Sequence, residues 1–137
     1  MTTGLIVNID VPDLDAGRAF YETALGMTFV RTLFGGAIAE LRHGGVLVHL
    51  HRHAAGSATK VADGAPRSYA PHWTPVHLDL LVDDLERVQE AAVAAGARVE
   101  RQAQSFSWGR IVRLRDPFGH GLCLIRQSPR GYDTVTP

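Results

Sequence analysis

Three histidines occupy alternate positions near the middle of the chain, at His49, His51 and His53. If this segment is a strand, alternate side chains point to one face, so the first two imidazoles lie side by side. Imidazole is a common ligand of catalytic zinc and non-haem iron. The spacing predicts that His49 binds a metal ion and that His51 is a second ligand or an acid–base group. The alternative is a polar pocket or a surface that contacts a partner chain.

A second set of candidates follows the same alternation. In residues 76–82, His77 and Asp79 share one face, while apolar side chains occupy the other. We expect His77 to be a metal ligand. Asp79, or Asp10 on a similar strand near the N-terminus, would complete a site of two or three histidines and a carboxylate, or act as a general base. The alternative for each carboxylate is an arginine partner.

Two related segments of the chain position these groups. Residues 7–14 and 78–85 have the same design, in which an alternating strand leads directly into a helix, and they lie 71 residues apart. The first helix is predicted to begin at about Asp13 and to end at Gly26, a position suited to a left-handed cap. The second is predicted over 84–95, with Asp83 as N-cap and Glu86 completing a capping box.

Alternating apolar runs separated by turn residues predict the remaining strands. The strands are expected at 4–11, 27–34, 36–42 and 45–52, and again at 75–82, 97–104, 108–115 and 119–126. The sequence therefore predicts an α+β fold, in which two tandem βαβββ modules, 4–52 and 74–126, form a cupped mixed sheet within a single domain, 1–137. Residues 53–73 are expected to be a linker or mobile loop, and 127–137 a tail that is disordered or covers a neighbouring chain.

Composition excludes several classes of partner. The chain has 14 basic and 14 acidic residues and no run of like charge, so we expect no nucleic-acid or membrane partner. It has no apolar stretch of about 20 residues and no signal-peptide pattern, which favours a cytoplasmic location. Cys123 is the only cysteine, so no intramolecular disulfide is expected. The sequence has no phosphate-binding glycine loop, nucleophile elbow or Cys-x-x-Cys pair.

The doubled order carries a family resemblance. The segments "VPDL…FYETALGM", "HLDLLVDDLERVQEAAVAAGARV" and "LRDPFGHGLCLI" resemble the vicinal oxygen chelate superfamily, which includes glyoxalase I, bleomycin- and fosfomycin-resistance proteins and extradiol dioxygenases. The resemblance covers residues 4–126, and the second half is most similar to an uncharacterised glyoxalase-like branch. It implies a small-molecule substrate or ligand and a homodimer.

The resemblance also implies four ligand positions, one on the first and one on the last strand of each module. In this chain they are Ile6, His49, His77 and Cys123. Isoleucine cannot bind a metal, and a cysteine binds one only as thiolate. The usual four-ligand site is therefore absent, and Cys123 is more simply a small buried residue.

The cup is expected to be lined by further side chains. Strand alternation places Ile6, Asn8 and Leu47 on the same face as the histidines. Trp108 is a candidate aromatic wall for a planar ligand, with a core or dimer contact as its alternative.

Three functional hypotheses remain. The first is a glyoxalase-like lyase, isomerase or dioxygenase that uses zinc, iron, nickel or manganese to act on a small oxygenated metabolite. The second is a metal-free isomerase or cyclase that uses the same histidines and carboxylates as acid and base. The third is a bleomycin-resistance-like protein that binds a drug without catalysis.

Overall fold

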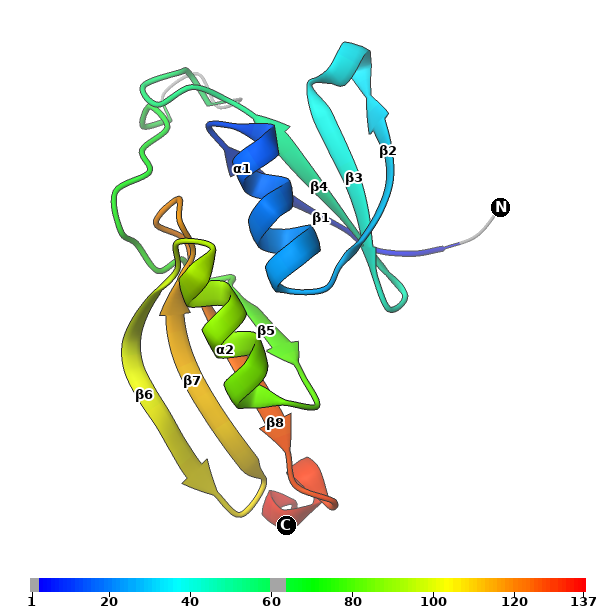
Figure 1. Ribbon diagram of the computed structural model, residues 1–137, viewed down its shortest axis with the longest axis vertical. Coiled ribbons are helices and arrows are strands. Elements are labelled where there is room, and N and C mark those ends of the chain that lie inside the picture. Colours follow the sequence, from blue (N-terminus) through cyan, green and yellow to red (C-terminus); the bar gives the residue numbers. More distant parts are fainter. Residues whose placement is uncertain (1–2, 60–63) are drawn as a thin grey trace. The chain divides into compact units, whose positions relative to one another are not determined.

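The computed structural model describes residues 3–59 and 64–137 of the chain (Figure 1). The chain divides into two compact units, Met1–Tyr69 and Ala70–Pro137, and each unit contains one four-stranded sheet. Residues 60–63 of the predicted linker lie outside the described residues.

The first unit follows the predicted βαβββ order. Its elements are β1 (Ile6–Val11), α1 (Leu14–Arg18) continued by a π-helical turn (Ala19–Ala24), β2 (Thr28–Leu33), a short 3-10 turn (Phe34–Gly36), β3 (Ile38–His43) and β4 (Val46–Arg52). The strand order in the sheet is β1-β4-β3-β2. Strand β1 pairs with β4 in parallel, and the other two pairs are antiparallel.

The second unit repeats this design. It consists of β5 (Leu78–Leu81), α2 (Leu85–Ala94), β6 (Arg98–Phe106), β7 (Gly109–Arg115), β8 (Gly121–Gln127) and a 3-10 turn (Gly131–Val135), and its strand order is β5-β8-β7-β6. The predicted α+β fold of two βαβββ modules is confirmed. Its assignment to one domain stays a prediction.

In the first sheet, strands β1 and β4 bury one face and carry polar side chains on the other. In the first unit, Val11, Leu41 and Leu50 are fully buried, and each such side chain contributes about 1.5–3 kcal/mol to stability. Helix α1 approaches this layer through Gly17, where a Cβ atom would lie 3.2 Å from Leu50 and Val11. Asn8 and His49, on the opposite face, are directly paired in the β1–β4 register. The alternation predicted from the sequence is therefore confirmed in these two strands.

The start of α2 differs from the prediction. Asp84, not Asp83, is the N-cap, and its side chain accepts a hydrogen bond from Arg87 N. The physical reason is that Val82 N still donates to Ile125 O at 2.8 Å, so the chain leaves the sheet one residue later than expected. Glu86 pairs with Arg110 instead of completing a capping box.

The predicted strand 75–82 is also shorter in the structure, where β5 begins at Leu78. Pro75 has no backbone N–H to donate to a neighbouring strand, which disfavours pairing at the start of this segment.

The described parts of the predicted linker and tail contain ordered contacts. Arg67 N donates to Ser57 O at 2.9 Å, and Gly56 N donates to Arg67 O at 2.7 Å. In the tail, the Tyr132 ring centre lies 5.3 Å from that of Trp108. Arg67 also donates to Asp10 on β1, so both segments contact other parts of their own units.

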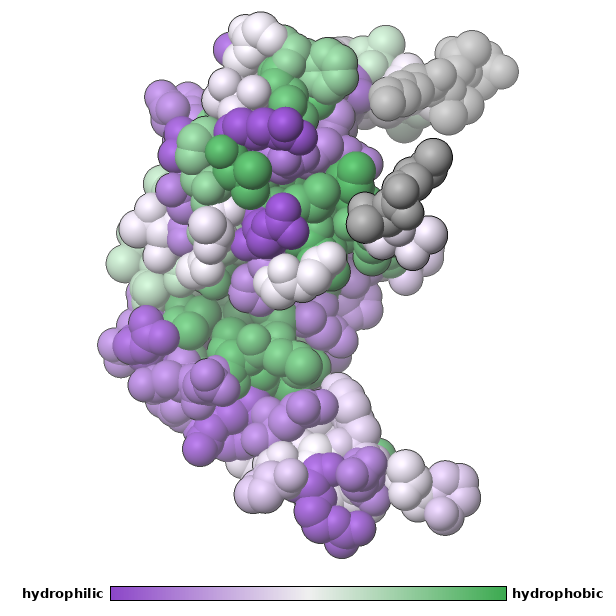
Figure 2. All heavy atoms as spheres, turned by 90° about the vertical axis from the view of Figure 1, so that its right-hand side faces the viewer, coloured by the Kyte–Doolittle hydropathy of each residue, from purple (hydrophilic) through white to green (hydrophobic). Residues whose placement is uncertain are grey.

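The surface mixes polar and apolar side chains. Figure 2 shows hydrophobic patches between strongly hydrophilic ones, and Phe34, Val76 and Leu81 are among the large apolar side chains that remain exposed. No helix in the described part of the chain has the length and hydrophobicity that a membrane span requires.

Candidate functional site

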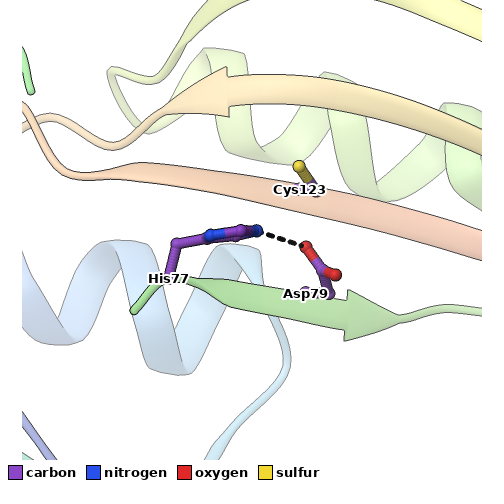
Figure 3. A group of neighbouring side chains, drawn as sticks. All are labelled: His77, Asp79 and Cys123. Carbon is purple, nitrogen blue, oxygen red and sulfur yellow. Dashed lines mark ion pairs between the residues drawn. The ribbon is translucent and has the colours of Figure 1, made fainter. Parts of the chain in front are cut away.

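Three potential metal ligands meet on the second sheet (Figure 3). Asp79 on β5 is the register partner of Cys123 on β8, and His77 lies two residues before Asp79 and therefore on the same face. The three donor atoms lie within 4.8 Å of one another. His77 Nε2 is 3.3 Å from Asp79 Oδ1. Within residues 3–59 and 64–137, this is the one such group of three or more His, Cys, Asp or Glu side chains.

Cys123 lies in the sheet as a protonated thiol. It is buried, and burial raises the pKa of its thiol to about 11, with further increases from the charge of Asp79 and from a hydrogen bond to it. Arg113 acts in the opposite direction and lowers this pKa. At neutral pH the thiol therefore donates to the Asp79 carboxylate. A metal ion that binds Cys123 must displace this proton.

The raised pKa predicts slow alkylation of Cys123. At pH 8 we expect iodoacetamide to modify the folded protein at least tenfold more slowly than the same protein in urea, because the thiolate is the reacting form and both burial and pKa reduce its availability. Mass spectrometry at timed intervals measures both rates. Equal rates in the folded and unfolded chain would show that Cys123 is not held as a buried thiol.

Trp73 packs beside this group. Its ring centre lies 5.5 Å from that of His77, and its Nε1 donates to Glu100 Oε2 at 2.6 Å. The ring rests directly on Gly121, since a Cβ atom there would lie 2.3 Å from it. A glycine at the start of β8 is therefore what allows an aromatic wall beside His77.

In the first unit, His49 takes part in a different arrangement. His49 Nε2 donates to Glu40 Oε2 at 2.7 Å, and Arg31 Nε donates to Glu40 Oε1 at 3.0 Å. The three residues are successive register partners across β4, β3 and β2. Glu40 is only 4% exposed. Sequence reasoning missed Glu40, although a charged residue inside the apolar run 38–41 was a usable signal.

The other predicted groups of this unit have separate partners. His51 Nε2 donates to Asn8 Oδ1 at 2.7 Å. Arg67 Nε donates to Asp10 Oδ2 at 2.7 Å, so the predicted alternative of an arginine partner applies to Asp10. The ring centres of His49 and His51 lie 6.2 Å apart. The structure thus assigns these imidazoles different hydrogen-bond acceptors, and a metal site that joins His49 to His77 stays a prediction.

The remaining predicted lining residues are placed as follows. Ile6 is 48% exposed, and Leu47, its partner in the β1–β4 register, is partly buried. Trp108 stacks on Phe106 with ring centres 5.2 Å apart and planes 2° from parallel. Their role in lining a ligand pocket stays a prediction.

Glu40 predicts an acid-dependent loss of stability. The hydrogen bond from His49 is the largest influence on its carboxyl pKa and lowers it, and Arg31 lowers it further against the effect of burial. Because the folded pKa lies below the unfolded value of about 4.5, the stabilisation is complete above that pH and is lost as pH falls through the folded pKa. Urea unfolding between pH 3 and 7 should show this loss, and Glu40→Gln should reduce it. An unchanged pH dependence in Glu40→Gln would contradict the assignment.

Comparison with known proteins identifies what this chain and its fold are similar to. A family profile described as a glyoxalase-like domain matches residues 6–125. No curated protein matches the sequence.

Several solved structures share the fold. A glyoxalase-related enzyme from Fulvimarina pelagi is 18% identical, with a TM-score of 0.67, 93% of this chain and 89% of that chain covered. The fosfomycin resistance protein FosX from Listeria monocytogenes is 12% identical, with a TM-score of 0.68 and coverage of 99% and 98%. An antibiotic binding protein from Streptomyces is 17% identical, with a TM-score of 0.65 and coverage of 93% and 98%.

Proposed function

Because the chain belongs to the glyoxalase-like domain family of the vicinal oxygen chelate superfamily, we propose that it is an enzyme that binds a divalent metal ion at His77, Asp79 and Cys123 and acts on a small oxygenated substrate. The observation that supports this proposal is the convergence of three donor atoms within 4.8 Å on one sheet face.

The chemistry of the donor set fits zinc. Imidazole, carboxylate and thiolate are all established zinc ligands, and catalytic zinc usually has three protein ligands and one open position. A separation of 3.3 Å between His77 Nε2 and Asp79 Oδ1 agrees with two ligands that are each about 2.0–2.2 Å from one ion. The thiol favours zinc over the harder magnesium or calcium.

Each residue has a distinct role in this proposal. When bound, the ion supplies Lewis-acid stabilisation of negative charge on substrate oxygens. Cys123 gives up its proton on binding, while His77 and Asp79 remain beside solvent, where a substrate can reach them. Trp73 covers one side of His77 and limits the orientations of its ring. The roles of Asp10 and His51 as general base or acid stay proposals.

Turnover assays test this function. Protein stripped with a chelator and then loaded with zinc is incubated with 2-oxoaldehydes, hydroxy acids, epoxides and catechols, and products are detected by mass spectrometry. We expect product from the loaded protein and none from the stripped protein. Turnover that survives the chelator would contradict metal dependence and favour the metal-free isomerase or cyclase.

Binding without catalysis is the second candidate function. Phe106, Trp108 and Tyr132 form a continuous series of ring contacts, and Phe106 and Tyr132 are nearly half exposed. Aromatic faces of this kind suit a planar ligand, and one structural neighbour is an antibiotic binding protein. Calorimetric titration with planar antibiotics, followed by mass spectrometry, distinguishes the candidates, because this one predicts saturable binding with no product.

A further inference from the structure

The second sheet contains three pairs of directly opposed arginines. They are Arg98 with Arg115, Arg101 with Arg113, and Arg110 with Arg126. Like charges directly opposite each other on neighbouring strands destabilise a sheet. Each pair therefore calls for a negatively charged group nearby.

Two of the pairs have a carboxylate within the protein. Glu100 forms an ion pair with Arg115, and Glu86 forms one with Arg110. Over the described ranges 3–59 and 64–137, no aspartate or glutamate lies within ion-pair distance of Arg101 or Arg113. Among the residues that the structure describes, this pair is thus the one of the three with no carboxylate within ion-pair distance.

The pair of Arg101 and Arg113 lies beside the candidate metal site. Arg113 on β7 is the register partner of Cys123 on β8, so the order across the sheet is Arg101, Arg113, Cys123 and Asp79. The Arg113 guanidinium carbon also lies 5.7 Å from the centre of the Trp73 ring. Both arginines line a small pocket together with Gln102, Gln104 and Ile111. An anionic group at the mouth of this pocket would meet two guanidinium groups and amide side chains.

We propose that Arg101 and Arg113 bind an anionic oxygen group, a carboxylate or a phosphate or phosphonate, on the substrate of the site described above. This inference rests on the proposed function, because it assigns the anionic group to the substrate of that site. The anion subsite itself does not require a metal. Guanidinium groups donate paired hydrogen bonds to planar or tetrahedral oxyanions. Neighbouring strands are about 4.8 Å apart, so the anionic group would lie within about two strand spacings of Cys123. The substrate is therefore a small acid whose reacting oxygens lie close to its charged end.

The test uses chelator-treated protein, so that it does not depend on metal binding. Inorganic phosphate, methylphosphonate and acetate are titrated by calorimetry and by NMR shift perturbation, with acetamide as the uncharged control. We expect saturable binding of at least one anion and none of acetamide. Preference among the three anions identifies the chemical class of the charged group.

Matched variants locate the binding. Arg101→Gln and Arg113→Gln are each expected to weaken anion binding at least tenfold, since charge-assisted hydrogen bonds are lost. Arg98→Gln is the control, because its opposed partner Arg115 already has Glu100. The same affinity in all three variants, or equal binding of acetamide, would overturn the proposal. Arg101→Gln should keep wild-type zinc affinity, whereas Arg113→Gln removes a charge that lowers the pKa of the Cys123 thiol and should weaken zinc binding as well. Absence of anion binding in the wild-type protein, together with intact zinc binding, would refute only this inference. Because each site variant removes one of two opposed charges, neither should lower the melting temperature.

Discussion

Replacing His77 by alanine is expected to weaken zinc binding by about 100-fold or more, since loss of groups that only support a ligand already costs 10–100-fold. His77 supplies the only imidazole among the three clustered donors. Competition titration against a chromophoric zinc chelator measures the affinity.

Zinc affinity should also depend on pH. Because Cys123 binds only as thiolate and the pKa of its thiol is about 11, the affinity should rise about tenfold per pH unit between pH 6 and 8, as the thiol releases its proton on binding.

Two other histidines of the same unit, which are not among the clustered donors, provide the matched control for His77→Ala. His72 Nε2 and His120 Nδ1 lie 3.0 Å apart. His120→Ala should leave the zinc affinity close to that of the wild type. Loss of affinity in His120→Ala with full affinity in His77→Ala would contradict the proposed site. An equal loss in His49→Ala would instead support the sequence-based prediction that His49 is a ligand.

Gly109→Ala is expected to destabilise the fold by about 3 kcal/mol or more, because it combines backbone strain with a steric clash. Gly109 has a φ of 148°, which residues with a side chain rarely adopt. A Cβ atom at this position would lie 2.3 Å from Arg126 O and 2.9 Å from Gln127 Cα. Both contacts are with the backbone of β8, so no side-chain rotation can relieve them. Strand β7, which carries Arg113, would have to move away from β8.

Urea unfolding of Gly109→Ala and Gly45→Ala tests this prediction. A Cβ atom at Gly45 would have no neighbour within 4 Å, and Gly45 has no positive φ. Gly45→Ala should therefore change the free energy of unfolding by less than about 1 kcal/mol. Similar stability of the two variants would mean that the close contact between β7 and β8 is not as the structure describes it.

The fold could be predicted because its signals are local and agree with one another. Pro12 directly follows β1, Asp13 caps α1 through Ala16 N, and Gly26 has the left-handed φ that was expected after the first helix. Strand alternation identified the buried and open faces of β1 and β4. The second half repeats these signals, so the doubled order followed from the sequence.

The site could be predicted only in part. Alternation alone placed His77 and Asp79 on one face. The approach of Cys123 to Asp79 depends on the β5–β8 register, which joins segments more than 40 residues apart and has no local signal. The link from Glu40 to His49 likewise depends on pairing between β3 and β4. The N-cap of α2 was wrong by one residue because two adjacent aspartates, Asp83 and Asp84, compete for that position.

Two predictions from the sequence do not depend on the strand register. The homodimer and the cytoplasmic location stay predictions. A second chain would cover exposed side chains such as Val76 and Leu81, and the molecular mass in solution, by light scattering, measures whether it does.

The most direct measurement of the central claim is X-ray absorption spectroscopy of the zinc-loaded protein. Binding by His77, Asp79 and Cys123 predicts one sulfur neighbour at about 2.3 Å from zinc, together with nitrogen and oxygen neighbours at about 2.0–2.2 Å. The sulfur contribution should disappear in Cys123→Ser. A wild-type spectrum with nitrogen and oxygen neighbours alone, or a protein that takes up no zinc, would contradict the proposed metal centre.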